Sequence, residues 1–107
     1  MAWFGKREQS FEEKFAHDEE LRFKILARRN KLLGLWAAEQ LGLKNEAAEK
    51  YAEDLLQFSV KNPGDDPLIK KIRTDFLVKK LRVSDHQIRR RMNELLQLAI
   101  EQVENEK

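Results

Sequence analysis

The chain has 107 residues, of which 37% are charged and 41% hydrophobic, and it contains no cysteine. A chain of this length fits one domain, which buries roughly 60 to 68% of the surface that the unfolded chain exposes. The missing cysteines exclude disulfide and thiol chemistry. No segment reaches the roughly 18 apolar residues of a membrane span or resembles a secretory signal. We therefore expect a cytoplasmic protein, and the high charge content favours helices with one apolar stripe.

The net charge is only +2, so the chain lacks the large positive field of a bulk nucleic-acid binder. The charges are unevenly distributed. Residues 1–20 carry three basic and six acidic side chains, whereas residues 68–91 carry nine basic side chains against two acidic ones. An acidic first part thus precedes a basic second part.

The first predicted helix is long. Ser10 and Glu13 form a capping-box pattern that predicts a helix from Phe11, and Gly42 fits the glycine that ends it. Gly34 lies inside this helix at a cost of roughly 1 kcal/mol relative to Ala, which is tolerable where another helix packs closely on the backbone. Its apolar stripe is Leu21, Ile25, Leu32 and Trp36.

Two shorter helices are predicted next. Asn45 fits the N-cap of the second helix, and the breaker at residues 62–64, Asn-Pro-Gly, ends it. Asp66 and Pro67 fit the N-cap and first residue of the third helix. The apolar stripes are Ala48, Tyr51, Ala52 and Leu55 in the second helix and Ile69, Ile72 and Phe76 in the third.

The last helix has the clearest start. Ser84 and Gln87 form a capping box, and Val83 and Ile88 are spaced as a hydrophobic staple. Its stripe is Ile88, Met92, Leu95, Leu96, Ala99 and Val103. Four helices with short connections predict an all-α, compact four-helix bundle over residues 15–107, preceded by a mobile segment over residues 1–14.

The sequence contains none of the common catalytic or phosphate-binding motifs, so we do not expect an enzyme. His17 stands beside Asp18 and near Glu20, a group that could supply metal ligands. We interpret His17 as a surface histidine and predict no metal site. His86, in the first turn of the last helix, is interpreted as structural.

The basic second part leaves two alternatives open. Arg89, Arg90 and Arg91 could belong to a helix-turn-helix that reads DNA, but three consecutive residues spread around a helix. They are better explained as a solvated face with an ion pair, and we expect no nucleic-acid partner. The second alternative is a nucleotide-sensing bundle without a Gly-rich loop. In that case ADP or ATP would contact Lys79, Arg82, Arg89 and Arg90. Apart from such a nucleotide, we expect no cofactor.

The N-terminal segment has the pattern of a helix that binds a groove. If residues 1–14 were helical, Phe4, Phe11 and Phe15 would share one stripe, with Trp3 beside them. Three buried Phe side chains contribute at most roughly 5 to 9 kcal/mol, whereas ordering about fourteen residues costs on the order of 14 kcal/mol. The segment therefore needs a partner to fold. Alternatively, Phe11 and Phe15 are ordinary contacts of the bundle.

Long stretches of the chain resemble the zeta subunit, the ATPase-inhibitor protein of alphaproteobacterial F-type ATP synthases. The resemblance includes FAHDEELRFK from Phe15, ARRNKLLGLWAAE from Ala27 and VSxHxIRRxMxELL from Val83. It covers nearly the whole chain. It implies a four-helix protein that docks on the catalytic head of the membrane-bound synthase without entering the membrane. The sequence does not determine the oligomeric state, and we expect the free protein to be a monomer.

The resemblance also implies how such a protein acts. Its N-terminal segment would insert as a helical wedge between catalytic and non-catalytic subunits and block rotation in the direction of ATP hydrolysis. Synthesis would be affected less, so ATP would be conserved when the proton gradient collapses. The opening at residues 3–6, Trp-Phe-Gly-Lys, differs from the more acidic opening of the family. Carried over by position, the contacts are Trp3, Phe4, Arg7, Glu8, Phe11, Glu13, Lys14 and Phe15.

Overall fold

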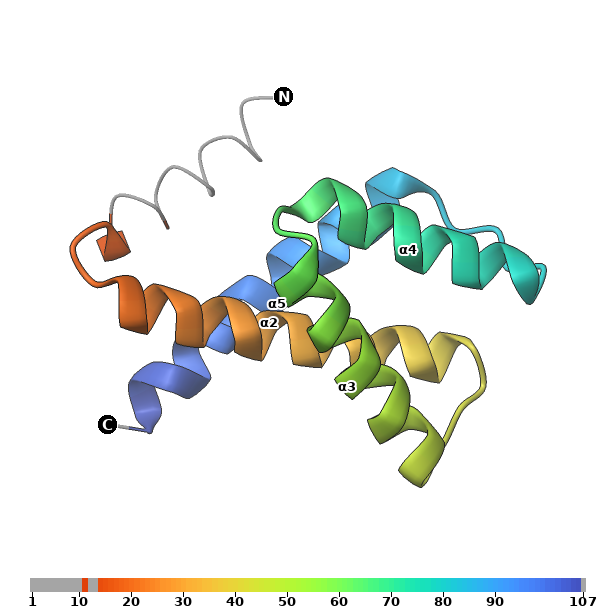
Figure 1. Ribbon diagram of the computed structural model, residues 1–107, viewed down its shortest axis with the longest axis horizontal. Coiled ribbons are helices and arrows are strands. Elements are labelled where there is room, and N and C mark those ends of the chain that lie inside the picture. The colour runs from red at the N-terminus through yellow and green to blue at the C-terminus, as the bar shows by residue number, and fades with distance from the viewer. Residues whose placement is uncertain (1–10, 12–13, 107) are drawn as a thin grey trace.

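The structure is a computed structural model that describes Phe11 and residues 14–106 (Figure 1). The helices of this part are α2 (Glu19–Gln40), α3 (Asn45–Lys61), α4 (Asp65–Val78) and α5 (Asp85–Asn105). They form one all-α bundle, so the predicted fold class is confirmed.

Helix α2 begins later than the sequence pattern predicts. The predicted continuous helix from Phe11 is wrong, because Ala16 and His17 form a turn and α2 starts only at Glu19. Asp18 is the N-cap, and its carboxylate accepts a hydrogen bond from the Leu21 N–H at 2.9 Å. Capping by Asp satisfies one of the free N–H groups of the first turn.

The C-terminal end of α2 agrees with the prediction. Gly42 has φ +80°, a backbone conformation that costs glycine little. The Gly42 N–H donates to the Glu39 carbonyl at 3.0 Å, and the Leu43 N–H donates to the Ala38 carbonyl at 2.9 Å. These two bonds make a Schellman motif, which ends α2 and turns the chain toward α3.

The starts of the next two helices differ from the prediction by one or two residues. Lys44, not Asn45, is the N-cap of α3, and Asn45 has φ +53°, a region that Asn tolerates better than most residues. Gly64 is the N-cap of α4, which places Pro67 third in that helix. Proline is tolerated there because the N–H groups of the first turn have no helical partner.

Helix α5 begins as predicted. The Ser84 side chain accepts from the Gln87 N–H at 3.1 Å, and the Gln87 side chain accepts from the Ser84 N–H at 2.9 Å, which completes the capping box. Val83 packs against the buried cluster that contains Ile88. The predicted stripe is buried, except that Leu95 is half-buried.

The four helices meet in a central cluster, which we define as Leu33, Ala37, Leu55, Leu68, Ile69, Ile72, Phe76, Ile88 and Met92. Helices α2 and α3 approach closely beside it. A Cβ atom built on Gly34 would lie 2.7 Å from the Cα of Ala52. The expectation that another helix packs on the Gly34 backbone is therefore confirmed.

Helix α5 lies beside α2 in the opposite direction. Its early residues belong to the central cluster, and its C-terminal end lies beside the first half of α2 (Figure 1). The Arg28 guanidinium donates to Gln102 at 3.0 Å and pairs with Glu106. The hydrogen bond from Arg28 lowers the pKa of the Glu106 carboxyl group. These polar contacts fix the register of the two helices.

A polar contact joins α3 to α4. The Tyr51 hydroxyl donates to the Asp75 carboxylate at 2.7 Å, and the Lys71 ammonium group lies 3.1 Å and 3.0 Å from the two oxygens of the same carboxylate. Burial and the hydrogen bond to Asp75 raise the pKa of Tyr51. The protonated hydroxyl is therefore the form that the folded protein favours.

We expect Gly34→Ala to lower the free energy of unfolding by about 1–3 kcal/mol, because the new methyl group would press on the α3 backbone. This loss should exceed the gain in helix propensity. Urea unfolding measures the change. Lys31→Ala, at an exposed position of α2, is the control and should change stability by no more than about 0.5 kcal/mol. A Gly34→Ala variant as stable as the wild type would contradict the close approach of α2 and α3.

We also expect Tyr51 to make folding sensitive to high pH. The pKa of Tyr51 is raised in the folded state. The stabilisation of the fold by the protonated hydroxyl is therefore complete at pH values below the tyrosine pKa of the unfolded chain, about 10, and is lost as the pH rises further. The stability difference between the wild type and Tyr51→Phe should therefore be constant up to about pH 10 and shrink above it. Unfolding in urea at a series of pH values measures this difference. A constant difference at higher pH would argue against the contact with Asp75.

Candidate functional site

The N-terminal segment meets the bundle through two aromatic side chains. Phe11 and Phe15 are helical in conformation and only 6% and 5% exposed, and their ring centres are 5.4 Å apart. They complete a second cluster, which we call the end cluster: Phe11, Phe15, Ile25, Leu96, Ala99 and Val103. In the free chain the two rings are thus contacts of the bundle, the alternative that the sequence left open.

An exposed break separates these two rings from α2. Ala16, His17 and Asp18 are exposed, and Ala16 and His17 form the turn. The Asp18 N–H donates to the Phe15 carbonyl at 3.2 Å. The Asp18 side chain, which follows the break, supplies the N-cap of α2.

Lys14 adds a polar contact to the same attachment. Its ammonium group lies 3.8 Å from the Glu104 carboxylate and 5.4 Å from the centre of the Phe15 ring. The two charged side chains are 61% and 43% exposed, so solvent screens the pair and its contribution is small. The apolar contact of the rings therefore dominates the attachment.

The predicted partner contacts fall into two groups. Trp3, Phe4, Arg7, Glu8 and Glu13 lie outside the described residues, as does the Ser10–Glu13 capping box. Phe11, Lys14 and Phe15 are described and lie on the bundle. Phe11 belongs to the predicted mobile segment, so packing begins before the predicted boundary at residue 14. The buried ring accounts for this difference.

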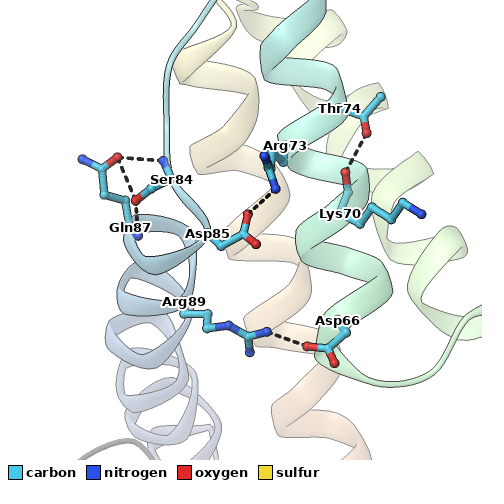
Figure 2. Close-up of polar contacts among 8 residues, drawn as sticks. All are labelled: Asp66, Lys70, Arg73, Thr74, Ser84, Asp85, Gln87 and Arg89. Carbon is cyan, nitrogen blue, oxygen red and sulfur yellow. Dashed lines mark hydrogen bonds and ion pairs between the residues drawn. The ribbon is translucent and has the colours of Figure 1, made fainter. Parts of the chain in front are cut away.

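The predicted phosphate contacts do not gather at one place. Arg89 on α5 points to Asp66 at the start of α4, and its guanidinium lies 2.5 Å from that carboxylate (Figure 2). The hydrogen bond to Asp66 raises the pKa of Arg89. Lys79 is the C-cap at the opposite end of α4, about 20 Å from Asp66 by the rise of a helix. Arg82 and Arg90 are exposed, and the nucleotide contact stays a prediction.

The neighbouring charges on α4 and α5 are also paired with each other. Arg73 donates to Asp85 at 3.3 Å beside the capping box (Figure 2). Arg91 pairs with Glu94 at 3.2 Å and lies 5.6 Å from the centre of the Trp36 ring. Arg73 and Arg89 thus join α4 to α5. The three consecutive arginines of α5 are exposed, which agrees with their interpretation as a solvated face with an ion pair.

A cavity of about 780 Å³ opens next to Phe11, between α2, the end of α3 and the start of α4. Phe23 and Val60, which are 66% and 58% exposed, line it with other apolar side chains. Its polar wall contains Arg29, which is only 6% exposed and donates to Asp65 at 2.8 Å. Sequence analysis did not single out Arg29, although it stands four residues after Ile25 and before Leu33 on the buried side of α2.

The described part of the chain contains neither a cluster of metal ligands nor a helix suited to span a membrane. Within Phe11 and residues 14–106, no three acidic or histidine side chains gather as metal ligands would, and His17 is exposed. Of the helices in this part, none combines the length and the apolar character that crossing a bilayer requires.

Comparison with known proteins identifies the family. The family of ATPase inhibitor subunit zeta matches residues 1–102. No curated protein matches the chain. The matched range includes the N-terminal segment and the bundle as far as Gln102, and of the end cluster only Val103 lies beyond it. The chain therefore belongs to the ATPase inhibitor subunit zeta family.

Proposed function

We propose that this protein inhibits ATP hydrolysis by the F-type ATP synthase and that its N-terminal segment is the inhibitory part. The family is one of ATPase inhibitor subunits, which supports a regulatory role instead of a catalytic one. The segment of roughly Phe4 to Phe15 inserts as a helical wedge into the catalytic head and stops rotation in the hydrolytic direction. The protein then acts at the periphery of the membrane-bound enzyme.

The main support for separate roles of the N-terminal segment and the bundle is the break before α2. Asp18 caps α2 by itself, so the bundle has a complete first helix whatever the preceding segment contacts. A segment that must fold against a partner needs such independence, because its conformation changes on binding. The bundle is then the support and the segment the inhibitor.

The length of the N-terminal segment also supports the proposal. Ten residues that precede Phe11 span at most about 36 Å when extended and about 15 Å as a helix. A helix of this length is long enough to place several side chains in a groove at i, i+3, i+4 and i+7. Trp3 and Phe4 are the aromatic anchors at its far end, and aromatic side chains are the residues that most often dominate binding.

The charged side chains of the segment add selectivity more than affinity. Arg7, Glu8, Glu13 and Lys14 carry both signs, so they fit a partner surface that also carries both. Lys14 and Glu104 are largely exposed in the free chain, and breaking this pair therefore costs little. Lys14 is accordingly available to a carboxylate of the synthase.

We expect deletion of residues 1–10 to abolish inhibition of ATP hydrolysis by the isolated catalytic head. Truncation before Phe11 keeps the end cluster intact, so the helical circular dichroism of the remaining chain should be preserved. Steady-state ATPase assays over a range of inhibitor concentrations measure the effect. Full inhibition by the truncated chain would exclude the wedge.

We expect Trp3→Ala combined with Phe4→Ala to weaken inhibition by about 30- to 1000-fold, since one anchor of this kind contributes about 2 kcal/mol and two contribute up to about 4 kcal/mol. Leu77→Ala combined with Val78→Ala is the matched control, because both side chains are more than half exposed at the end of α4. This control should inhibit like the wild type. Similar losses in both double variants would show that the segment has no special role.

A further inference from the structure

Two aromatic side chains, Phe11 and Phe15, have two alternative binding places. Phe11 and Phe15 are almost completely buried in the end cluster of the free chain. The proposed wedge, which reaches from about Phe4 to Phe15, needs them in contact with the synthase. A ring cannot fill both places at once, so the bundle and the synthase compete for it.

The attachment is built so that it can open. The bundle supplies the side chains against which the two rings pack, and we call these four side chains the groove. They are Ile25 on α2 and Leu96, Ala99 and Val103 on α5. Across the exposed turn, the Asp18 N–H contacts the Phe15 carbonyl, and Lys14 contacts Glu104. Both are contacts that water can replace. The Asp18 cap of α2 lies on the bundle side of the turn and survives release.

We propose that the end cluster is a self-inhibitory contact: with Phe11 and Phe15 seated, a closed form holds the wedge on its own bundle, and inhibition requires their release. This inference rests on the proposed function and adds its regulation. Burial of two Phe rings biases the equilibrium toward the closed form by up to about 10²- to 10⁴-fold. The apparent affinity for the synthase falls by the same factor, because only the released form binds.

The alternative is that the chain pivots before Phe11 and leaves both rings on the bundle. The two cases differ in what the bundle side of the cluster does. If release is required, weakening the groove strengthens inhibition, because the closed form loses stability and the wedge itself is unchanged. If the rings stay seated, the groove has no such effect.

A reversible cross-link tests the proposal directly. The chain has no cysteine, so Lys14→Cys with Glu104→Cys can be joined specifically by a thiol-cleavable bismaleimide across the turn. We expect the linked protein to lose inhibition in proportion to the linked fraction, because the link blocks release and only the released form binds, and to recover the inhibition of the unlinked variant when the linker is cleaved. The same variant capped with a monofunctional maleimide shows the effect of modification alone.

The matched control is a link that does not cross the turn. Lys24 and Glu106 form a comparable exposed pair at 3.6 Å, from α2 to the end of α5. Lys24→Cys with Glu106→Cys, linked in the same way, should inhibit equally before and after cleavage. Equal inhibition by the linked and cleaved 14–104 variant would overturn the self-inhibitory contact, whereas absence of inhibition by the wild type would overturn the proposed function.

A second variant changes only the groove. Val103 is 1% exposed in the end cluster, and Val103→Ala removes two methyl groups from the wall against which the rings pack. We expect inhibition to become roughly tenfold tighter, with helical circular dichroism preserved. Unchanged or weaker inhibition by the folded variant would contradict the proposal.

Discussion

The close approach of α2 and α3 at Gly34 is the constraint on which the rest of the bundle depends. With no Cβ between the two backbones, α3 lies near enough for Leu55 to share a cluster with Leu33 of α2. Helices α4 and α5 then enclose this cluster. Because α5 continues along α2 in the opposite direction, its last turns have no α3 or α4 to cover them, and the end cluster forms there with rings from the N-terminal segment.

Local signals predict much of this architecture. The Gly42 terminus and the Ser84–Gln87 capping box involve residues within a few positions of one another, so the sequence alone contains all the interacting groups. The start of α2 has a signal of the same kind. Asp18 followed by two acidic residues is a standard N-terminus, but the Ser10–Glu13 pattern upstream competes with it. Whether the chain breaks at Ala16 and His17 before this N-terminus depends on packing that a local pattern does not contain.

The pairs between distant residues could not be predicted in this way. Arg29 joins Asp65, and Arg89 joins Asp66, across 36 and 23 positions of the chain. Asp66 directly precedes Pro67 in a segment that has the pattern of a helix start, so local reasoning assigns it to capping and gives Asp65 no role. Their true partners depend on how α4 is oriented relative to α2 and α5. Likewise, the pattern gave Phe11 and Phe15 two interpretations, and only the position of α5 distinguishes them.

The independent cap of α2 has a consequence for how such a protein can evolve. The Asp18 side chain supplies the N-cap of α2, and the Asp18 N–H donates to the Phe15 carbonyl. Insertions and substitutions upstream of Phe11 therefore leave the folding of the bundle largely unaffected. If the N-terminal segment is the inhibitory part, as proposed, its first ten residues can change under selection for inhibition, while the remainder of the chain is constrained separately by the packing of its helices.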